Sequence, residues 1–225
     1  MHRIVDKVVE LFKWPVAFFL LLSLPALIKS LDYFGFANLR YWALFAGFLF
    51  FFVGRTMMDA SVRTSMEVLA HELTHSFFAL LTLHKVKGLK INSDDSGGSM
   101  AFEGEGNWLI IMAPYFFPLF GFIAMLTITI YQWFAPMNIL INGVFGYVIG
   151  YHVDTVCSQI HEKQTDLIKV GYPFCAVFLL PANLWMLGWM LAFNTRGWSG
   201  IAVFNGLIWD LDKKYLSYAL NLIGA

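Results

Sequence analysis

His71, Glu72 and His75 form the pattern H-E-x-x-H, whose spacing suits metal-dependent hydrolysis. On a helix the two histidines project from one face about 40° apart, so both imidazoles can reach one metal ion. The intervening Glu72 can then reach a water bound to that metal and take its proton. The pattern predicts a site for one zinc ion with Glu72 as general base, and such a site needs a third protein ligand, usually a carboxylate.

The residues alone leave that third ligand open. Asp166 stands at the start of the last long apolar segment, and Asp154 lies inside an earlier one. Either carboxylate could reach the zinc. Asp95 is a weaker choice because it lies in a glycine-rich turn. His161 and Glu162 are expected in a solvated loop.

Composition indicates an integral membrane protein. Of the 225 residues, 59% are hydrophobic and only 13% are charged, and mean hydropathy is +0.65. Ordinary soluble domains carry about 25% charged residues. The net charge is zero, so no nucleic-acid partner is expected. Cys157 and Cys175 lack metal-ligand spacing and are interpreted as packing residues.

The pattern of charges predicts an all-α polytopic protein with about six transmembrane helices, folded as a single domain over residues 1–225. The first apolar segment is interpreted as a retained helix, not a signal peptide, and Pro15 and Pro25 allow it to bend. A spanning helix needs about 20 apolar residues, and the first two segments are shorter. The expected helices cover residues 14–28, 41–54, 64–83, 108–131, 137–157 and 170–194.

Local signals also predict the elements that surround the motif. Thr64 is expected to cap the motif helix, with Glu67 reaching back to it, and Gly88 suits the exit. Alternation over residues 86–102, interrupted by a turn-rich stretch, predicts a β-hairpin. The tail, 198–225, alternates apolar and charged residues and is predicted to lie on the membrane surface.

The apolar surroundings strengthen the case for a metal site. It costs free energy to place two histidines and a glutamate of an apolar helix in lipid. Ionisable groups inside a membrane therefore usually serve a function. The alternative is a set of packed or pore-lining polar residues. Four prolines in the later helices are interpreted either as simple kinks or as points where the bundle opens a water path, namely Pro114, Pro118, Pro173 and Pro181.

The chain resembles the site-2 protease family of intramembrane zinc metallopeptidases, in particular its small bacterial-type members. The resemblance rests on the stretch from His71 to Leu81, followed by Lys85–Gly88 and by Gly97-Gly98. The proline-bearing run Ala113–Pro118 with Gly121 is also similar to the helix that follows in the family. The similarity extends over roughly residues 65–190, which we take as the catalytic core.

The resemblance implies a zinc endopeptidase of the bacterial inner membrane that cleaves a transmembrane helix of another protein. It implies a membrane-associated hairpin in which Gly97, Gly98 and Ser99 contact the substrate. It favours Asp166 as the third ligand and leaves Asp154 second. The family's usual Asn-Pro with Leu-Asp-Gly string does not occur here, so the ligand role is carried to Asp166 by its position at the start of a late apolar helix. The oligomeric state is not predicted.

Two other functions compete with proteolysis. A catalytically silent relative would bind membrane proteins without cleaving them, although the intact Glu72 argues against this. A transporter of metals or other ions would line a pathway with His71, His75, His152 and Asp154.

Overall fold

The computed structural model describes residues 1–35, 38–91, 97–162 and 164–222. Over this part of the chain it forms eleven α-helices, two short 3-10 helices labelled η, and one two-stranded sheet. In chain order the elements are α1 (His2–Leu11), α2 (Lys13–Leu22), α3 (Leu24–Ser30), η1 (Leu31–Phe34), α4 (Leu39–Met57), α5 (Ala60–Leu81), β1 (Val86–Ile91), β2 (Gly98–Phe102), α6 (Trp108–Met112), η2 (Ala113–Tyr115), α7 (Leu119–Tyr131), α8 (Ile139–Gln159), α9 (Thr165–Val170), α10 (Tyr172–Arg196) and α11 (Trp198–Leu222).

Two of these helices, α8 and α10, are long and apolar enough to cross a membrane. Two bent pairs could each add one span: α2 with α3–η1, bent by 49°, and α6–η2 with α7, bent by 77°. The described residues thus support two to four spans, fewer than the six predicted. The difference lies in α4, which carries an arginine near each end, and in α5, which carries the polar motif.

The motif helix α5 begins earlier than predicted. Its N-cap is Asp59, whose side chain accepts a hydrogen bond from the Ser61 N–H at 2.8 Å. The predicted cap Thr64 lies inside the helix, so the capping-box prediction was wrong. The predicted exit at Gly88 was also wrong, because Gly88 lies in β1 and the chain turns at Leu83, whose φ is +63°.

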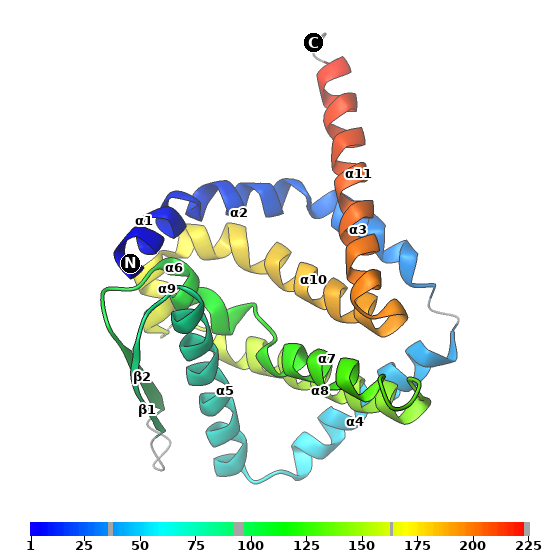
Figure 1. The fold of residues 1–225 in the computed structure, drawn as a ribbon, viewed down its shortest axis with the longest axis horizontal. Helices are drawn as coiled ribbons and strands as arrows, with labels where there is room; N and C mark the ends of the chain where they lie inside the picture. The colour runs from blue at the N-terminus through cyan, green and yellow to red at the C-terminus, as the bar shows by residue number, and fades with distance from the viewer. Residues whose placement is uncertain (36–37, 92–96, 163, 223–225) are drawn as a thin grey trace.

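The predicted β-hairpin is confirmed. Strands β1 and β2 are antiparallel, with Leu89 opposite Met100, and both strands pack against α5 (Figure 1). Residues 92–96 of the predicted turn, including Asp95, lie outside the described residues. The hairpin therefore lies beside the helix that carries the motif.

The single helix predicted over 108–131 is broken. Helix α6 passes into η2, and α7 begins after Pro118, which occupies its N-cap. Pro114 lies within η2. Proline lacks an N–H and cannot continue an α-helical hydrogen-bond ladder, so two prolines four residues apart end α6 and redirect the chain. Of the later prolines, Pro173 stands in the first turn of α10, and Pro181 lies inside that helix.

Helices α4 and α8 pack closely together, and glycine permits it. A Cβ atom at Gly146 would overlap the backbone of Leu44, and one at Gly47 would overlap the backbone of Gly143. Small residues at such crossings let helix backbones approach one another in membrane proteins. These contacts hold the first half of α8 against α4, and the pairing of Asp154 with Arg55 joins the two helices nearer the end of α8.

The C-terminal tail is one continuous helix, α11. Figure 1 shows it projecting away from the rest of the molecule, and its buried residues all lie in its first half. They are Gly200, Ile201, Phe204 and Ile208. Its placement on the membrane surface stays a prediction.

Candidate metal centre

Three side chains predicted for the zinc site converge on one point. His71 and His75 come from α5, and Asp166 comes from the first turn of α9. The two Nε2 atoms lie 2.9 Å apart, and Asp166 Oδ2 lies 3.5 Å from His71 Nε2 and 3.3 Å from His75 Nε2. Among the described residues, these three form a group able to hold a metal ion.

The orientation of the His75 ring is fixed by a hydrogen bond at Nδ1, the ring nitrogen that faces away from this point. Its Nδ1 lies 2.8 Å from the backbone carbonyl of Ile110 in α6. A carbonyl only accepts hydrogen bonds, so Nδ1 carries the proton and the Nε2 lone pair faces His71 and Asp166. In a continuous helix the Ile110 carbonyl would be bonded by residue 114, but Pro114 has no N–H to offer.

The ring of His71 is fixed in the same way by α8. Its Nδ1 lies 2.9 Å from Oε1 of Gln159, the last residue of that helix. Each histidine therefore has an oxygen acceptor on its outer nitrogen. Metal-binding histidines generally show this arrangement, because it sets the tautomer and the ring orientation.

The donor set fits zinc. Two imidazole lone pairs and a carboxylate oxygen point at one place, and such a cluster of electron donors is stabilised by a cation between them. Ligands of a tetrahedral zinc, about 2.0–2.2 Å from the ion, lie about 3.3–3.6 Å from one another. The three separations of 2.9, 3.3 and 3.5 Å are close to that range. Two histidines with one carboxylate also form a common catalytic zinc set that leaves a position open.

The environment of Asp166 keeps its carboxylate ionised. Tyr115, fully buried in η2, donates its hydroxyl hydrogen to Asp166 Oδ2 at 3.3 Å. Lys169 Nζ lies 3.5 Å from the other oxygen. An ionised carboxylate is the form that binds a cation.

Glu72 lies beside this group, between the motif helix and the hairpin. Its side chain is 7% exposed, and the Met100 backbone of β2 offers it a hydrogen bond. A Cβ atom at Gly98 would lie 2.9 Å from Glu72 Cγ and 2.6 Å from Val68 Cγ1. Glycine at position 98 therefore allows the strand to approach the carboxylate closely.

Two cavities open onto the motif, and both are bordered by His71, Glu72 and Gly98. The larger, about 450 Å³, also touches His75 and Asp166, and Ser99 borders it. The second, about 350 Å³, is bordered by Gly97. The three residues predicted to contact substrate thus all line space next to the motif. The larger cavity has an apolar side made of Met100, Phe102, Ile110 and Ile111.

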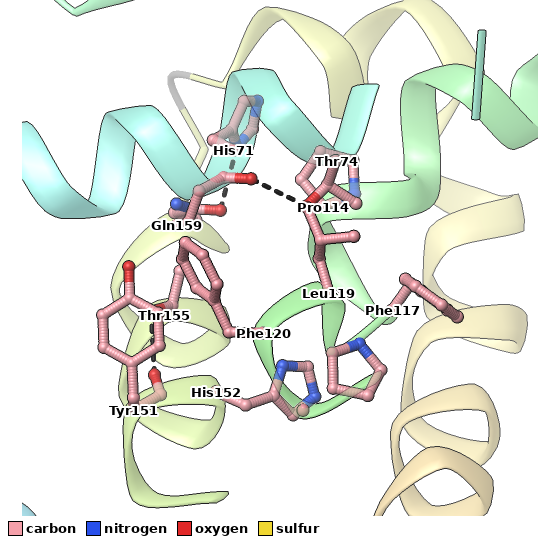
Figure 2. A pocket seen from close by; sticks show the side chains of 13 residues that line it. His71, Thr74, Pro114, Phe117, Leu119, Phe120, Tyr151, His152, Thr155 and Gln159 are labelled. Atoms are coloured by element: carbon pink, nitrogen blue, oxygen red, sulfur yellow. Dashed lines mark hydrogen bonds between the residues drawn. The ribbon is translucent and has the colours of Figure 1, made fainter. Parts of the chain in front are cut away.

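The second-choice ligand, Asp154, does not join the cluster. Its carboxylate pairs with the Arg55 side chain of α4, and both groups are largely withdrawn from solvent. His152, on the same helix, borders a separate cavity of about 20 Å³ that reaches the back of His71 (Figure 2). The distances therefore favour Asp166 over Asp154. His161 is exposed, as expected for a solvated loop, and borders the 350 Å³ cavity.

Tyr115 and Gln159 contact the proposed ligands, but no pattern in the sequence predicts this. Tyr115 lies in the proline-bearing run Ala113–Pro118, where the prolines and the similarity to the family, and not the tyrosine, carry the prediction. Gln159 ends an apolar helix just before the polar loop. The available signal for Gln159 was a polar side chain at the end of an apolar helix. Its partner, His71, lies on another helix, so local pattern cannot predict their contact.

Comparison with known proteins finds one family model that matches the segment carrying the motif. Residues 41–152 match a family model described as Peptidase M50B-like. The matched segment contains α5 and the hairpin, with all of His71, Glu72 and His75, and it ends before Asp166. No curated protein and no solved structure matches the chain. The resemblance predicted from the motif and hairpin is confirmed, because residues 41–152 form a Peptidase M50B-like domain, a domain of a site-2 protease family.

Proposed function

We propose that this protein is a zinc-dependent endopeptidase that hydrolyses peptide bonds in transmembrane helices of other proteins. The observation that carries the proposal is the convergence of His71, His75 and Asp166 beside Glu72. Membership of a peptidase family and helices able to span a membrane support the same function. We further propose a multi-pass protein of the bacterial inner membrane, with α4 and α5 completing about six spans.

His71, His75 and Asp166 would hold one zinc ion. Bound zinc polarises a peptide carbonyl and lowers the pKa of a water molecule that it binds. Other residues of the chain keep the three ligands in position. Gln159, Ile110 and Tyr115 each contact one of the three ligands and hold it in place.

Glu72 acts as the general base and then as the general acid. Its carboxylate takes a proton from the attacking water and later delivers it to the nitrogen of the departing amine. Glu72 is largely buried under β2 and meets solvent through the two cavities that border the motif, where the attacking water and the substrate would enter. Transfer through a single carboxylate conserves protons over the reaction, since the water loses the proton that the new amine gains.

The substrate must be unwound before it reaches this site, because a helix hides its peptide carbonyls in its own hydrogen bonds. We propose that an unwound segment pairs with the free edge of the hairpin, near Gly98 and Ser99. The 450 Å³ cavity with its apolar side suits the side chains of a membrane helix. A hairpin beside the motif helix thus provides both a docking edge and access to Glu72.

The test measures zinc and cleavage on the same preparation. Purified protein in detergent is analysed for zinc by elemental mass spectrometry and incubated with a single-span model protein carrying helix-breaking residues. We expect about one zinc per chain. We also expect fragments cut within the span. Glu72→Gln should keep its zinc and lose cleavage. Chelation should abolish cleavage, and added zinc should restore it.

Two outcomes would overturn the proposal. Wild-type protein that holds one zinc and cleaves no member of a panel of such spans would be a silent binding relative. Protein that holds no zinc would not be a metallopeptidase. The transport alternative has less support, because Asp154 pairs with Arg55 instead of facing the motif histidines.

A further inference from the structure

Gln159 connects the end of α8 to the motif helix through both atoms of its amide. Its side chain is buried, with 7% of the residue exposed. Oε1 lies 2.9 Å from His71 Nδ1, and Nε2 donates to the backbone carbonyl of Glu67 at 3.3 Å. Figure 2 shows Gln159 reaching from its helix towards the His71 ring.

These two contacts fix which way the amide points. The Glu67 carbonyl can only accept, so it requires the NH₂ end of the amide. The oxygen end is then left facing His71 and can only accept from it. His71 therefore carries its proton on Nδ1, and its Nε2 lone pair faces His75 and Asp166.

We propose that Gln159 is a positioning residue that sets the tautomer and orientation of His71 for metal binding. This inference rests on the proposed function, and it assigns a role to a residue outside the matched segment 41–152. Gln159 and Asp166 stand at the two ends of the polar loop that joins α8 to α9. Both ends of this loop contact His71, one at each ring nitrogen.

The packing around Gln159 shows why another group does not replace it easily. Gln159 borders the 20 Å³ cavity behind His71, which has room for about one water molecule. A shorter side chain would enlarge this space and let water bond to His71 Nδ1 in its place. Leucine has a similar volume, no acceptor and little room left for water, so it removes the hydrogen bond without substituting another.

The test compares Gln159→Leu, Gln159→Glu and a matched control, Ser158→Ala. Ser158 is the neighbouring residue and contacts the Glu67 side chain, but it has no contact with His71. Zinc affinity is measured by competition with a chromogenic chelator. The tautomer of His71 is measured by nitrogen NMR on zinc-free protein, at a pH about two units above the usual histidine pKa. The His71 signal is identified by its loss in His71→Gln.

Loss of an outer partner of a metal-binding histidine typically costs about 10- to 100-fold in metal affinity. We expect a loss of that size in Gln159→Leu, with part of His71 moving its proton to Nε2. Gln159→Glu keeps an acceptor at the same position and should retain the Nδ1–H tautomer and most of the affinity. Ser158→Ala should match wild type in both measurements.

The proposal is overturned if Gln159→Leu binds zinc like wild type, or if it loses zinc while His71 keeps its tautomer. It is also overturned if Gln159→Glu loses as much affinity as Gln159→Leu, since that pattern indicates a packing role. Neither measurement uses cleavage. A wild-type protein that shows the Gln159 dependence but cuts no substrate would leave this inference standing and remove the proposed function.

Discussion

The backbone carbonyl of Ile110 accepts a hydrogen bond from Nδ1 of His75 at 2.8 Å. This contact joins the short helix α6 to the motif helix. It exists because residue 114 is a proline and leaves the Ile110 carbonyl without its usual helical partner. The break in the helix thus leaves an acceptor for Nδ1 of His75, one of the three residues proposed to hold zinc.

Pro114→Ala should therefore weaken metal binding. Alanine brings back an N–H that competes with His75 for the Ile110 carbonyl, so the His75 ring loses part of its anchoring. We expect zinc affinity to fall by up to about tenfold, the lower end for loss of an outer partner. Competition with a chelator measures the zinc affinity. Pro181→Ala, inside α10, is the control, and an equal loss in both variants would contradict the explanation.

Substitution of the two candidate carboxylates, Asp166 and Asp154, should have different effects on zinc binding and stability. Asp166→Ala removes a converging ligand atom, so we expect loss of bound zinc and of cleavage. Asp154→Ala leaves the Arg55 guanidinium partly buried without its partner, so we expect a lower melting temperature with zinc retained. Elemental analysis and thermal unfolding distinguish the two effects. Retention of one zinc by Asp166→Ala would show that the third ligand lies elsewhere.

Cleavage should fall when a larger side chain replaces Gly98. Its substitution by valine places side-chain atoms against Glu72 and Val68, and the strand must then move away from the motif. We expect cleavage to fall at least about tenfold, as for other displacements of catalytic groups. Zinc should be retained, because the three atoms nearest a Cβ at residue 98 belong to Val68, Glu72 and Lys90, none of which is a proposed ligand. Gly88→Val is the matched control in β1, where a Cβ meets no neighbour within 4 Å.

The N-terminal helix should contribute to stability through Asp6. Its carboxylate accepts from Asn107 Nδ2 at 2.7 Å and lies 3.2 Å from Nε2 of the buried His84. Asp6→Ala leaves both groups without this acceptor, which costs about 1–3 kcal/mol for a buried polar group. Denaturant or thermal unfolding measures the loss, with the exposed Lys7→Ala as control. An unchanged stability would mean that α1 is not anchored by this carboxylate.

Features that depend on local geometry could be predicted from the sequence. Two histidines four residues apart share a helix face because the hydrogen-bonded helix has 3.6 residues per turn. Alternation and turn residues likewise predicted the hairpin that contacts α5. Pro114 and Pro118 were interpreted as kinks or opening points in one helix over residues 108–131, so neither the break that they cause nor its consequence for His75 was predicted.

The packing of the helices sets which distant groups meet these local elements, and it could not be predicted from local pattern. Asp154 and Asp166 are chemically equivalent in sequence, and the difference between them arises because α4 presents Arg55 to one while α9 turns the other towards the histidines. Gln159 is likewise an ordinary helix-end residue until the packing of α8 places it against His71. Local pattern reflects the period of one element, whereas these contacts depend on how several elements pack together.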